Sequence, residues 1–255
     1  MRNRITAALI SGLLLSAFAG TAQADGLSDL KAALAKLQGS APLKATVEAR
    51  TWNRQGDGKD LEETSGLASV SLEESARGLQ VLYSKDTLNK LDAEERAKEK
   101  DSKAKTPTLN ALSEVNSSAL RPMIFAGPAL TRMMEKANFK SEKADTYKGQ
   151  AARVLSFEFS IDKLSERERK FMKKYEGLLD IWIAADGTPL GCKATQNIHG
   201  RAYVVISFDI RNEEEWTFAV VGDRLVATRK ENRNNGSGMG EKGEGKVVKT
   251  LQIQG

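Results

Sequence analysis

The sequence predicts an α+β domain built on a long antiparallel sheet. Apolar and polar residues alternate along several stretches in both halves of the chain, as they do in strands with one buried face. Helical spacing of apolar residues is confined to the start and the middle. The chain has 255 residues, and we expect residues 25–255 to form a single domain with its own core.

The first part of this region predicts one helix followed by strands. Leucines at helical spacing predict a short amphipathic helix over residues 27–37, with Gly39 available to end it. Alternation over residues 43–50 then predicts a half-buried strand. Turn sequences at 55–59 and 75–78 separate it from two further strands, which are expected over 61–72 and 79–83. Three antiparallel strands in series are therefore expected.

Residues 86–105 differ from the rest of the chain because charged side chains dominate them. Glu94 and Lys98, and Glu99 and Lys103, are spaced to pair along one side of a helix, which favours a solvated helix. The same composition also fits a disordered charged linker. The segment is therefore expected to be either a helical insertion or a linker.

Residues 108–137 predict helix in two pieces, interrupted around Arg121-Pro122 and Gly127-Pro128. This region is rich in methionine, a flexible apolar residue that suits surfaces which repack around varied ligands. The side chains could equally be core residues that cover the sheet. Function therefore needs more support than this composition alone.

The pattern of alternation returns from residue 139 onward. A short charged helix is expected over 162–174, after a strand that ends near residue 161. Residues 178–184 are apolar on both faces, which predicts a central strand covered on both sides, and Asp186-Gly187 marks a hairpin turn after it. Further strands are expected over 189–197, 201–211, 214–221, 224–231 and 246–254. A flexible glycine-rich loop is expected over 232–246, between the last two of them.

The first 24 residues predict a cleaved signal peptide. Arg2 and Arg4 precede an apolar run over residues 7–19, and Ala22-Gln23-Ala24 supplies the small residues that a signal peptidase requires. The run is shorter than the roughly 20 residues that span a bilayer, so an N-terminal membrane anchor is the weaker alternative. We therefore expect an exported, soluble periplasmic protein with no transmembrane segment in its mature chain.

The scarcity of cysteine and histidine restricts the possible chemistry. Cys192 and His199 are the single cysteine and the single histidine, so the chain can form neither an internal disulfide nor a zinc site of the usual composition. They are seven residues apart, which places them on opposite faces of an unbroken strand; a buried thiol and a loop histidine are expected. The formal charge of +5 is spread among interleaved acids and bases, which argues against a nucleic-acid partner. No metal or cofactor is expected.

The order of elements suggests a family. A leading helix precedes LKATVEARTWNRQG, SGLASVSLEES and a strand that begins after Arg77-Gly78, and DIWIAADGTPLGCKATQNI follows in the second half. This order resembles the LolA/LolB-like periplasmic lipoprotein carriers and outer-membrane lipoprotein-sorting proteins. The resemblance implies a curved half-barrel sheet with helices on its concave face, which shelters acyl chains. It also implies that Arg77 occupies the place of the arginine that holds the lid helices closed.

From these observations we expect a non-enzymatic protein that binds a lipid-like apolar ligand or an acylated protein between sheet and helices. The expected lining residues are Trp52, Leu79, Val81, Met123, Ile124, Phe125, Met133, Met134, Phe157, Phe159 and Trp182. One alternative is an interaction module for another envelope protein, which would bind through residues 86–105 and 232–246. Another is a secreted hydrolase that uses a serine with His199.

Overall fold

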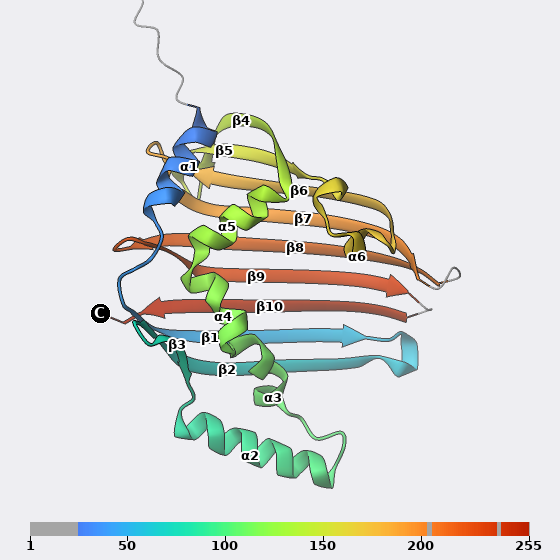
Figure 1. Cartoon of the computed structure of the whole chain (residues 1–255). Coiled ribbons are helices and arrows are strands. Elements are labelled where there is room, and N and C mark those ends of the chain that lie inside the picture. Colours follow the sequence, from blue (N-terminus) through green and yellow to red (C-terminus); the bar gives the residue numbers. More distant parts are fainter. Residues whose placement is uncertain (1–24, 203–205, 239–240, 255) are drawn as a thin grey trace, which may run out of the picture.

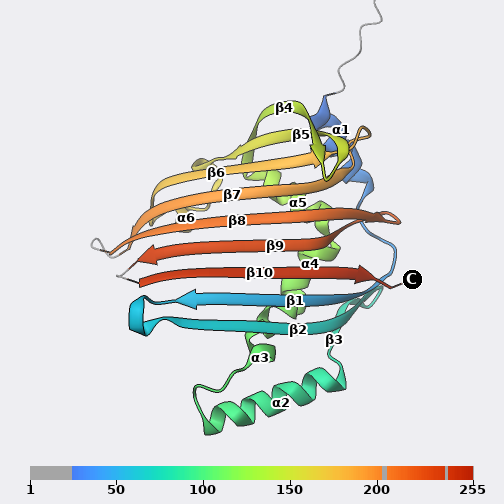
Figure 2. The same cartoon turned by 180° about the vertical axis from the view of Figure 1, so that it is seen from behind.

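A computed structural model describes residues 25–202, 206–238 and 241–254, so the predicted signal peptide lies outside the described residues. Within these ranges, ten strands form one open antiparallel sheet in the order β3-β2-β1-β10-β9-β8-β7-β6-β5-β4. Figures 1 and 2 show the sheet curving around helices that lie on one of its faces. The predicted α+β class, with a long curved antiparallel sheet and helices on the concave face, is confirmed.

The strands are long, and β1 pairs with the last strand to join the two ends of the chain. Their bounds are β1 (Leu43–Gln55), β2 (Glu62–Ser75), β3 (Gly78–Leu82), β4 (Ala137–Tyr147), β5 (Gln150–Phe159), β6 (Met172–Ile183), β7 (Pro189–Ala202), β8 (Ile206–Val221), β9 (Arg224–Gly238) and β10 (Glu241–Ile253). The helical elements are α1 (Gly26–Lys36), α2 (Lys85–Lys100), α3 (Pro107–Leu112), α4 (Ser117–Ile124), α5 (Ala126–Glu135) and α6 (Glu166–Arg169), with single turns η1 (Gly58–Asp60), η2 (Ser113–Val115) and η3 (Ile161–Lys163).

The two faces of the sheet differ in what covers them. On β1, Ala45, Val47 and Ala49 are fully buried beneath the helices, whereas alternate residues such as Arg50 point away from them. Cross-strand register extends this division from strand to strand, for example by pairing Val47 with Leu251 of β10. We call the helix-covered side the inner face and the other side the outer face.

The charged segment after β3 is the helix α2, so the helical alternative describes it. Ser84 caps its N-terminus by accepting a hydrogen bond from the backbone of Thr87. The Glu94 carboxylate in turn accepts hydrogen bonds from the backbone N–H groups of Thr108 and Leu109, at 2.9 and 3.0 Å, and so caps α3. This cap attaches α2 to the layer of helices.

The prediction of a flexible loop over 232–246 is wrong. Strand β9 extends to Gly238 and β10 starts at Glu241. The two strands pair with each other, and β9 also pairs with β8 and β10 with β1. Glycine and asparagine are poor strand formers by themselves, but pairing on both sides of each strand overrides that preference. The hairpin thus lies in the middle of the sheet.

Several predicted boundaries also change. Two strands were expected at 201–211 and 214–221, but residues 206–221 form the single strand β8, and residues 201–202 belong to β7. The charged helix expected over 162–174 is reduced to η3 and the short α6, because β6 begins at Met172. The helical region has three helices, and the break before α5 falls at Phe125, whereas Pro122 lies inside α4.

Candidate functional site

A hollow of about 780 Å³ lies between α1, α5 and the strands β4 and β5. We call it the first hollow. Its apolar walls come from both helices and both strands and include Leu27, Leu34, Met134, Phe139 and Phe157. Polar side chains, among them Lys31 and Glu135, also line it. Concave sites of this size with mainly apolar walls and a few polar groups are typical of small-ligand binding.

Helix α1 forms one wall of the first hollow because an ionic cluster attaches it to the sheet. Arg153 of β5 contacts Asp29 of α1 at 2.7 Å and Glu142 of β4 at 3.2 Å. Glu142 also accepts a hydrogen bond of 3.0 Å from the backbone N–H of Gly26. The hydrogen bond to Asp29 is the main reason that the pKa of Arg153 lies above its usual value. These contacts hold α1 across the edge of the sheet.

A second hollow, of about 550 Å³, lies on the other side of α5. We call it the second hollow. Its apolar part comes from Pro122, Ala129, Met133 and Phe159. The inner face of β7, β8 and β9 supplies Ala194 and Trp216 together with a larger set of polar side chains, namely Gln196, Glu214, Lys230, Asn212, Asn232 and Asn234. Two cations, Arg132 of α5 and Lys136 just after it, line the helix side. The second hollow therefore has a mainly apolar part and a mainly polar part.

Helix α5 separates the two hollows. Met133 lines the second hollow and Met134 the first, because consecutive helical residues point about 100° apart. Phe157 and Phe159 share the inner face of β5 and divide in the same way. Two of the methionines and two of the phenylalanines singled out in the sequence are thus divided between the two sides of one helix.

The break between α4 and α5 is held by Arg224, a residue that sequence reasoning missed. Arg224 is 2% exposed, and it donates hydrogen bonds of 3.2 Å to the carbonyl of Ile124 and 2.7 Å to that of Ala41. Its guanidinium lies 4.6 Å from the centre of the Phe125 ring. Burial is the main cause that lowers the pKa of Arg224. In the sequence, Arg224 follows the turn residues Gly222 and Asp223, and this position does not predict that the side chain is buried.

The remaining expected lining residues fall into two groups. Met123 and Ile124 are fully buried in the core beneath α4, and Phe125 is half-buried at the break. Leu79 and Val81 are half-buried on the edge strand β3, where they pack against the same core. These five residues belong to the packing between helices and sheet, and none of them lines either hollow.

Trp52 and Trp182 lie on the outer face, away from the helices. Their ring N–H groups donate to the carboxylates of Glu63 and Asp145, at 2.8 and 2.9 Å. Trp52 shares the alternate positions of β1 that carry polar residues such as Arg50, so the alternation already predicted that it points outward. The strand of Trp182 is apolar on both faces, so parity could not place it.

Arg77 is exposed in the turn between β2 and β3. Its backbone N–H donates to Ser75, and within the described part of the chain its side chain makes no ion pair with a helix. The arginine whose side chain contacts the helices at the break between α4 and α5 is Arg224, which lies far from Arg77 in the sequence.

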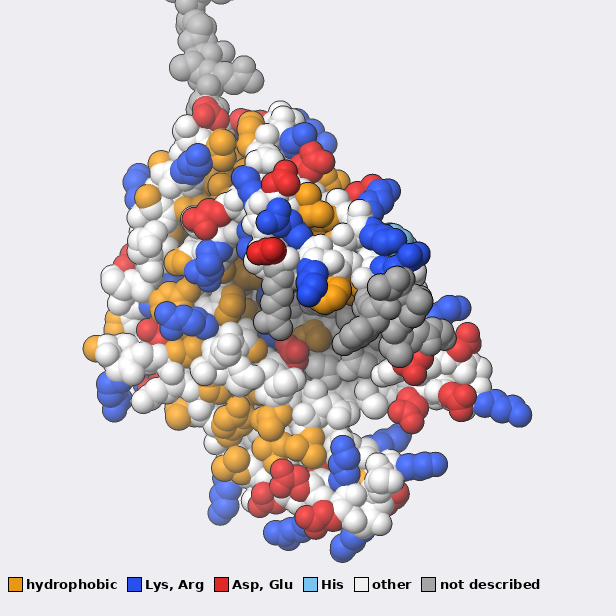
Figure 3. Space-filling view, turned by 45° about the vertical axis from the view of Figure 1, so that its right-hand side comes forward, with side chains coloured by type: hydrophobic (Ala, Val, Ile, Leu, Met, Phe, Trp, Pro, Cys, Tyr) orange, Lys and Arg blue, Asp and Glu red, His pale blue; other side chains and the backbone are white. Residues whose placement is uncertain are grey.

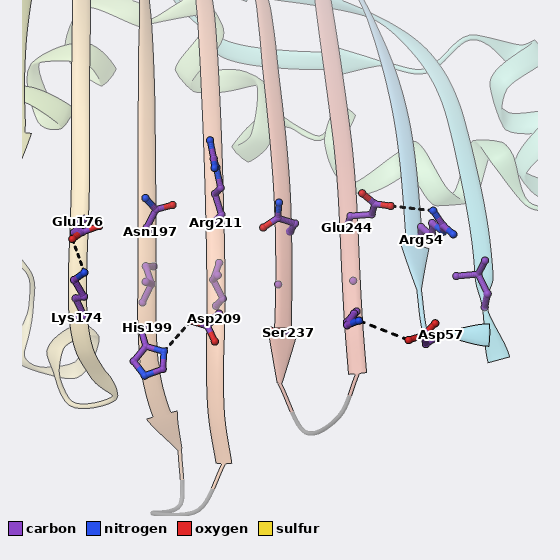
Figure 4. A pocket seen from close by; sticks show the side chains of 18 of the residues that line it. Arg54, Asp57, Lys174, Glu176, Asn197, His199, Asp209, Arg211, Ser237 and Glu244 are labelled. Carbon is purple, nitrogen blue, oxygen red and sulfur yellow. Dashed lines mark hydrogen bonds and ion pairs between the residues drawn. The ribbon is translucent and has the colours of Figure 1, made fainter. Parts of the chain in front are cut away.

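The outer face carries a hollow of about 850 Å³ at the far ends of β6 to β10. Figure 4 shows most of its charged side chains joined in pairs, some within one strand, as for Lys174 and Glu176, and others between neighbouring segments. Arg54 and Glu244 lie 3.5 Å apart, and His199 and Asp209 lie 2.8 Å apart. Because exposed pairs of this kind neutralise one another, the hollow offers little charge for a ligand.

His199 lies in strand β7, where the sequence predicted a loop. Register places Asp209 between His199 and Ser237 on adjacent strands, whereas a Ser-His-Asp triad needs the histidine in the middle. Cys192 is on the inner face, and burial raises the pKa of its thiol well above the usual range. The predictions that the thiol is buried and that Cys192 and His199 point to opposite faces are confirmed.

Residues 25–202, 206–238 and 241–254 hold no group of three or more histidine, cysteine, aspartate or glutamate side chains suited to a metal ion. Likewise, none of the helices described combines the length and apolar character needed to cross a membrane.

Comparison with known proteins adds one structural similarity. No protein-family model matches the chain, and no curated protein matches it. Among solved structures, a LolA superfamily protein from Nitrosomonas europaea matches over 90% of this chain and 94% of its own, at 10% sequence identity and a TM-score of 0.28.

Proposed function

We propose that this protein is a soluble, non-enzymatic periplasmic protein that binds the acyl chain of a lipid or of an acylated protein in the first hollow. The observation that carries the proposal is the composition of that hollow, whose walls combine Leu27, Leu34, Phe157 and the adaptable Met134. Each methylene group moved from water into such a site contributes about 0.8 kcal/mol. A long chain can therefore be held with few polar contacts.

Uptake of a fluorescent fatty acid tests the proposal, with two matched variants on α1. Ala35 lines the first hollow, whereas Ala32 lies on the same helix outside it, and both side chains are exposed. Ala35→Trp fills the hollow and is expected to weaken fatty-acid binding by about ten-fold or more, the equivalent of roughly two lost methylene contacts. Ala32→Trp is expected to leave binding unchanged.

Native mass spectrometry of the protein purified from its own compartment supplies the second measurement. We expect an added mass of a lipid or acyl group on the wild type and less of it on Ala35→Trp. A lipid-free wild type that also fails to take up labelled fatty acid would refute the proposal. Equal weakening by Ala35→Trp and Ala32→Trp would refute the placement in the first hollow.

A second candidate function is an interaction module for another envelope protein, for which α2 is the supporting observation. This helix buries Leu91 and Thr87 but leaves Leu88 about half exposed, at 49%. Figure 3 shows its outward side covered with charged side chains below a band of hydrophobic ones. Deletion of residues 86–105 separates the two functions: loss of a captured partner with unchanged fatty-acid uptake would favour this one.

A further inference from the structure

Carboxamide side chains form a row across the inner face of the sheet beside the second hollow. Gln196 of β7 pairs in register with Asn212 of β8, and Asn212 pairs with Asn234 of β9. Asn234 pairs with Gly245 of β10, which pairs with Asn53 of β1. Residues directly opposite each other in antiparallel strands point to the same face. The four amides therefore lie along one line that crosses five strands.

Gly245 makes the row possible where it crosses β10. A Cβ atom at this position would overlap the side-chain oxygens of both Asn234 and Asn53. Glycine is thus required for the two amides to converge above this strand. Gly245 is buried, because the side chains of Asn234 and Asn53 occupy the position on the inner face where its own side chain would lie.

The amides of the row differ from the charged groups beside them in having no protein partner. Across the described ranges, the side chains of Gln196, Asn212 and Asn234 make no hydrogen bond to another residue. By contrast, Glu214 and Lys230 in the same hollow pair with each other at 3.3 Å. Lys230 also lies 4.4 Å above the ring of Trp216. Glu214 and Lys230 thus neutralise each other, whereas the neutral amides remain available to a ligand.

We infer that the second hollow is a binding site for a neutral, hydroxyl-rich group of the sugar type that is attached to an apolar chain. The carboxamides would bind the hydroxyl groups, and the chain would lie against Met133 and Phe159 at the apolar end of the same hollow. This site is separate from the first hollow, so the inference goes beyond the proposed function.

The chemistry of the row favours hydroxyl groups over other ligands. A carboxamide offers both donors and acceptors, as a hydroxyl group does, whereas an anion uses only the donors and a cation only the acceptors. An anionic head group would instead be drawn to Arg132 and Lys136, which line the hollow from the helix side and not from the row. An extended peptide advances about 3.3 Å per residue, which does not match amides set about 4.8 Å apart by the spacing of strands.

Titration with dodecyl maltoside and dodecyl phosphate below their critical micelle concentrations, and with dodecanol below its solubility limit, tests the inference by calorimetry. These probes carry the same chain and differ in the head group. We expect the maltoside to bind about ten-fold tighter than either of the others, the equivalent of one or two net hydrogen bonds. Tighter binding of the phosphate, or equal binding of all three, would overturn the inference.

Neighbouring asparagines supply matched variants on opposite faces of β9. Asn234→Ala removes an amide of the row, whereas Asn235→Ala removes one that points to the outer face. Asn234→Ala is expected to weaken maltoside binding about five-fold without changing dodecanol binding, because one hydrogen-bonding group is lost. Asn235→Ala is expected to change neither. Equal effects of the two variants would contradict the placement of the site.

The two hollows can be tested independently. Ala35→Trp is expected to leave maltoside binding unchanged, and Asn234→Ala to leave fatty-acid uptake unchanged. Failure of fatty-acid uptake alone would remove the proposed function and keep the sugar-type site. Failure of the head-group preference alone would do the reverse. Gly245→Ala, which displaces two amides together, is expected to weaken maltoside binding at least as much as Asn234→Ala.

Discussion

The guanidinium of Arg224 lies 4.6 Å from the centre of the Phe125 ring, at the break between α4 and α5. The same guanidinium donates to the carbonyl of Ile124, which is a free acceptor at the end of α4. A residue that starts β9 therefore holds the helices that cover the sheet. Because the group is buried and charged, its hydrogen bonds cannot be lost without a cost in folding free energy.

Replacing Arg224 is expected to destabilise the protein more than replacing an exposed arginine. Arg224→Lys cannot reach both the Ile124 and Ala41 carbonyls and stack on Phe125 at once, so we expect a loss of about 1–3 kcal/mol in the free energy of unfolding. Arg50→Lys is the control, because Arg50 is exposed and pairs with Glu48 on the surface. Urea unfolding measures both. Equal midpoints for the two variants would argue against the role assigned to Arg224.

The single cysteine provides a test of core packing. Cys192 is 2% exposed, and burial raises the pKa of its thiol, so both access and thiolate formation are suppressed in the folded protein. We expect no reaction with a thiol reagent at pH 8 in native buffer and one equivalent of reaction in urea. Immediate labelling of the native protein would show that the inner face of β7 is open to solvent.

Sequence reasoning predicted the fold where the local pattern and the tertiary environment agree. The alternation in β1 placed Ala45, Val47 and Ala49 on the covered face because that strand has one polar side. The same reasoning failed at 232–246, since composition there indicates a loop whereas the partners of the strands lie elsewhere in the chain. The residues within 232–246 do not by themselves predict that β9 pairs with β8 and β10 with β1.

The candidate site was less predictable than the fold for a related reason. Met133, Met134, Phe157 and Phe159 were singled out by their type, and each lines one of the two hollows that flank α5. The carboxamide row had no such signal, because its members come from four strands and become neighbours only through register. A row of that kind can be seen only once the strands are paired.

The pKa of Asp223 makes stability depend on pH in the acid range. Hydrogen bonds from the Ser40 hydroxyl, the Ser40 N–H and the Ala41 N–H lower the pKa of this carboxyl to about 2. Because the folded pKa lies below the unfolded value of about 3.9, the stabilisation is complete above the unfolded value and is lost as pH falls toward 2. We expect the difference in Tm between wild type and Asp223→Asn to shrink from pH 5 to pH 2. A difference that is constant over this range would contradict the assignment.

The ionic cluster at α1 links stability to the first hollow. Arg153→Gln removes the cation between Asp29 and Glu142 and leaves two carboxylates facing each other, both at least two-thirds covered. We expect a loss of about 1–3 kcal/mol in the free energy of unfolding, since hydrogen bonds to charged groups are lost. Hydrogen exchange of the α1 amides should rise more than that of the central strands.

Detachment of α1 also removes one wall of the first hollow, so Arg153→Gln is expected to weaken fatty-acid uptake while dodecyl maltoside still binds. Arg54→Gln is the control, because Arg54 pairs with Glu244 on the exposed outer face, where a salt bridge contributes at most about 1 kcal/mol. That variant should leave α1 exchange and fatty-acid uptake unchanged. If α1 exchange rose in Arg153→Gln without any loss of uptake, α1 could not be a wall that the bound chain needs.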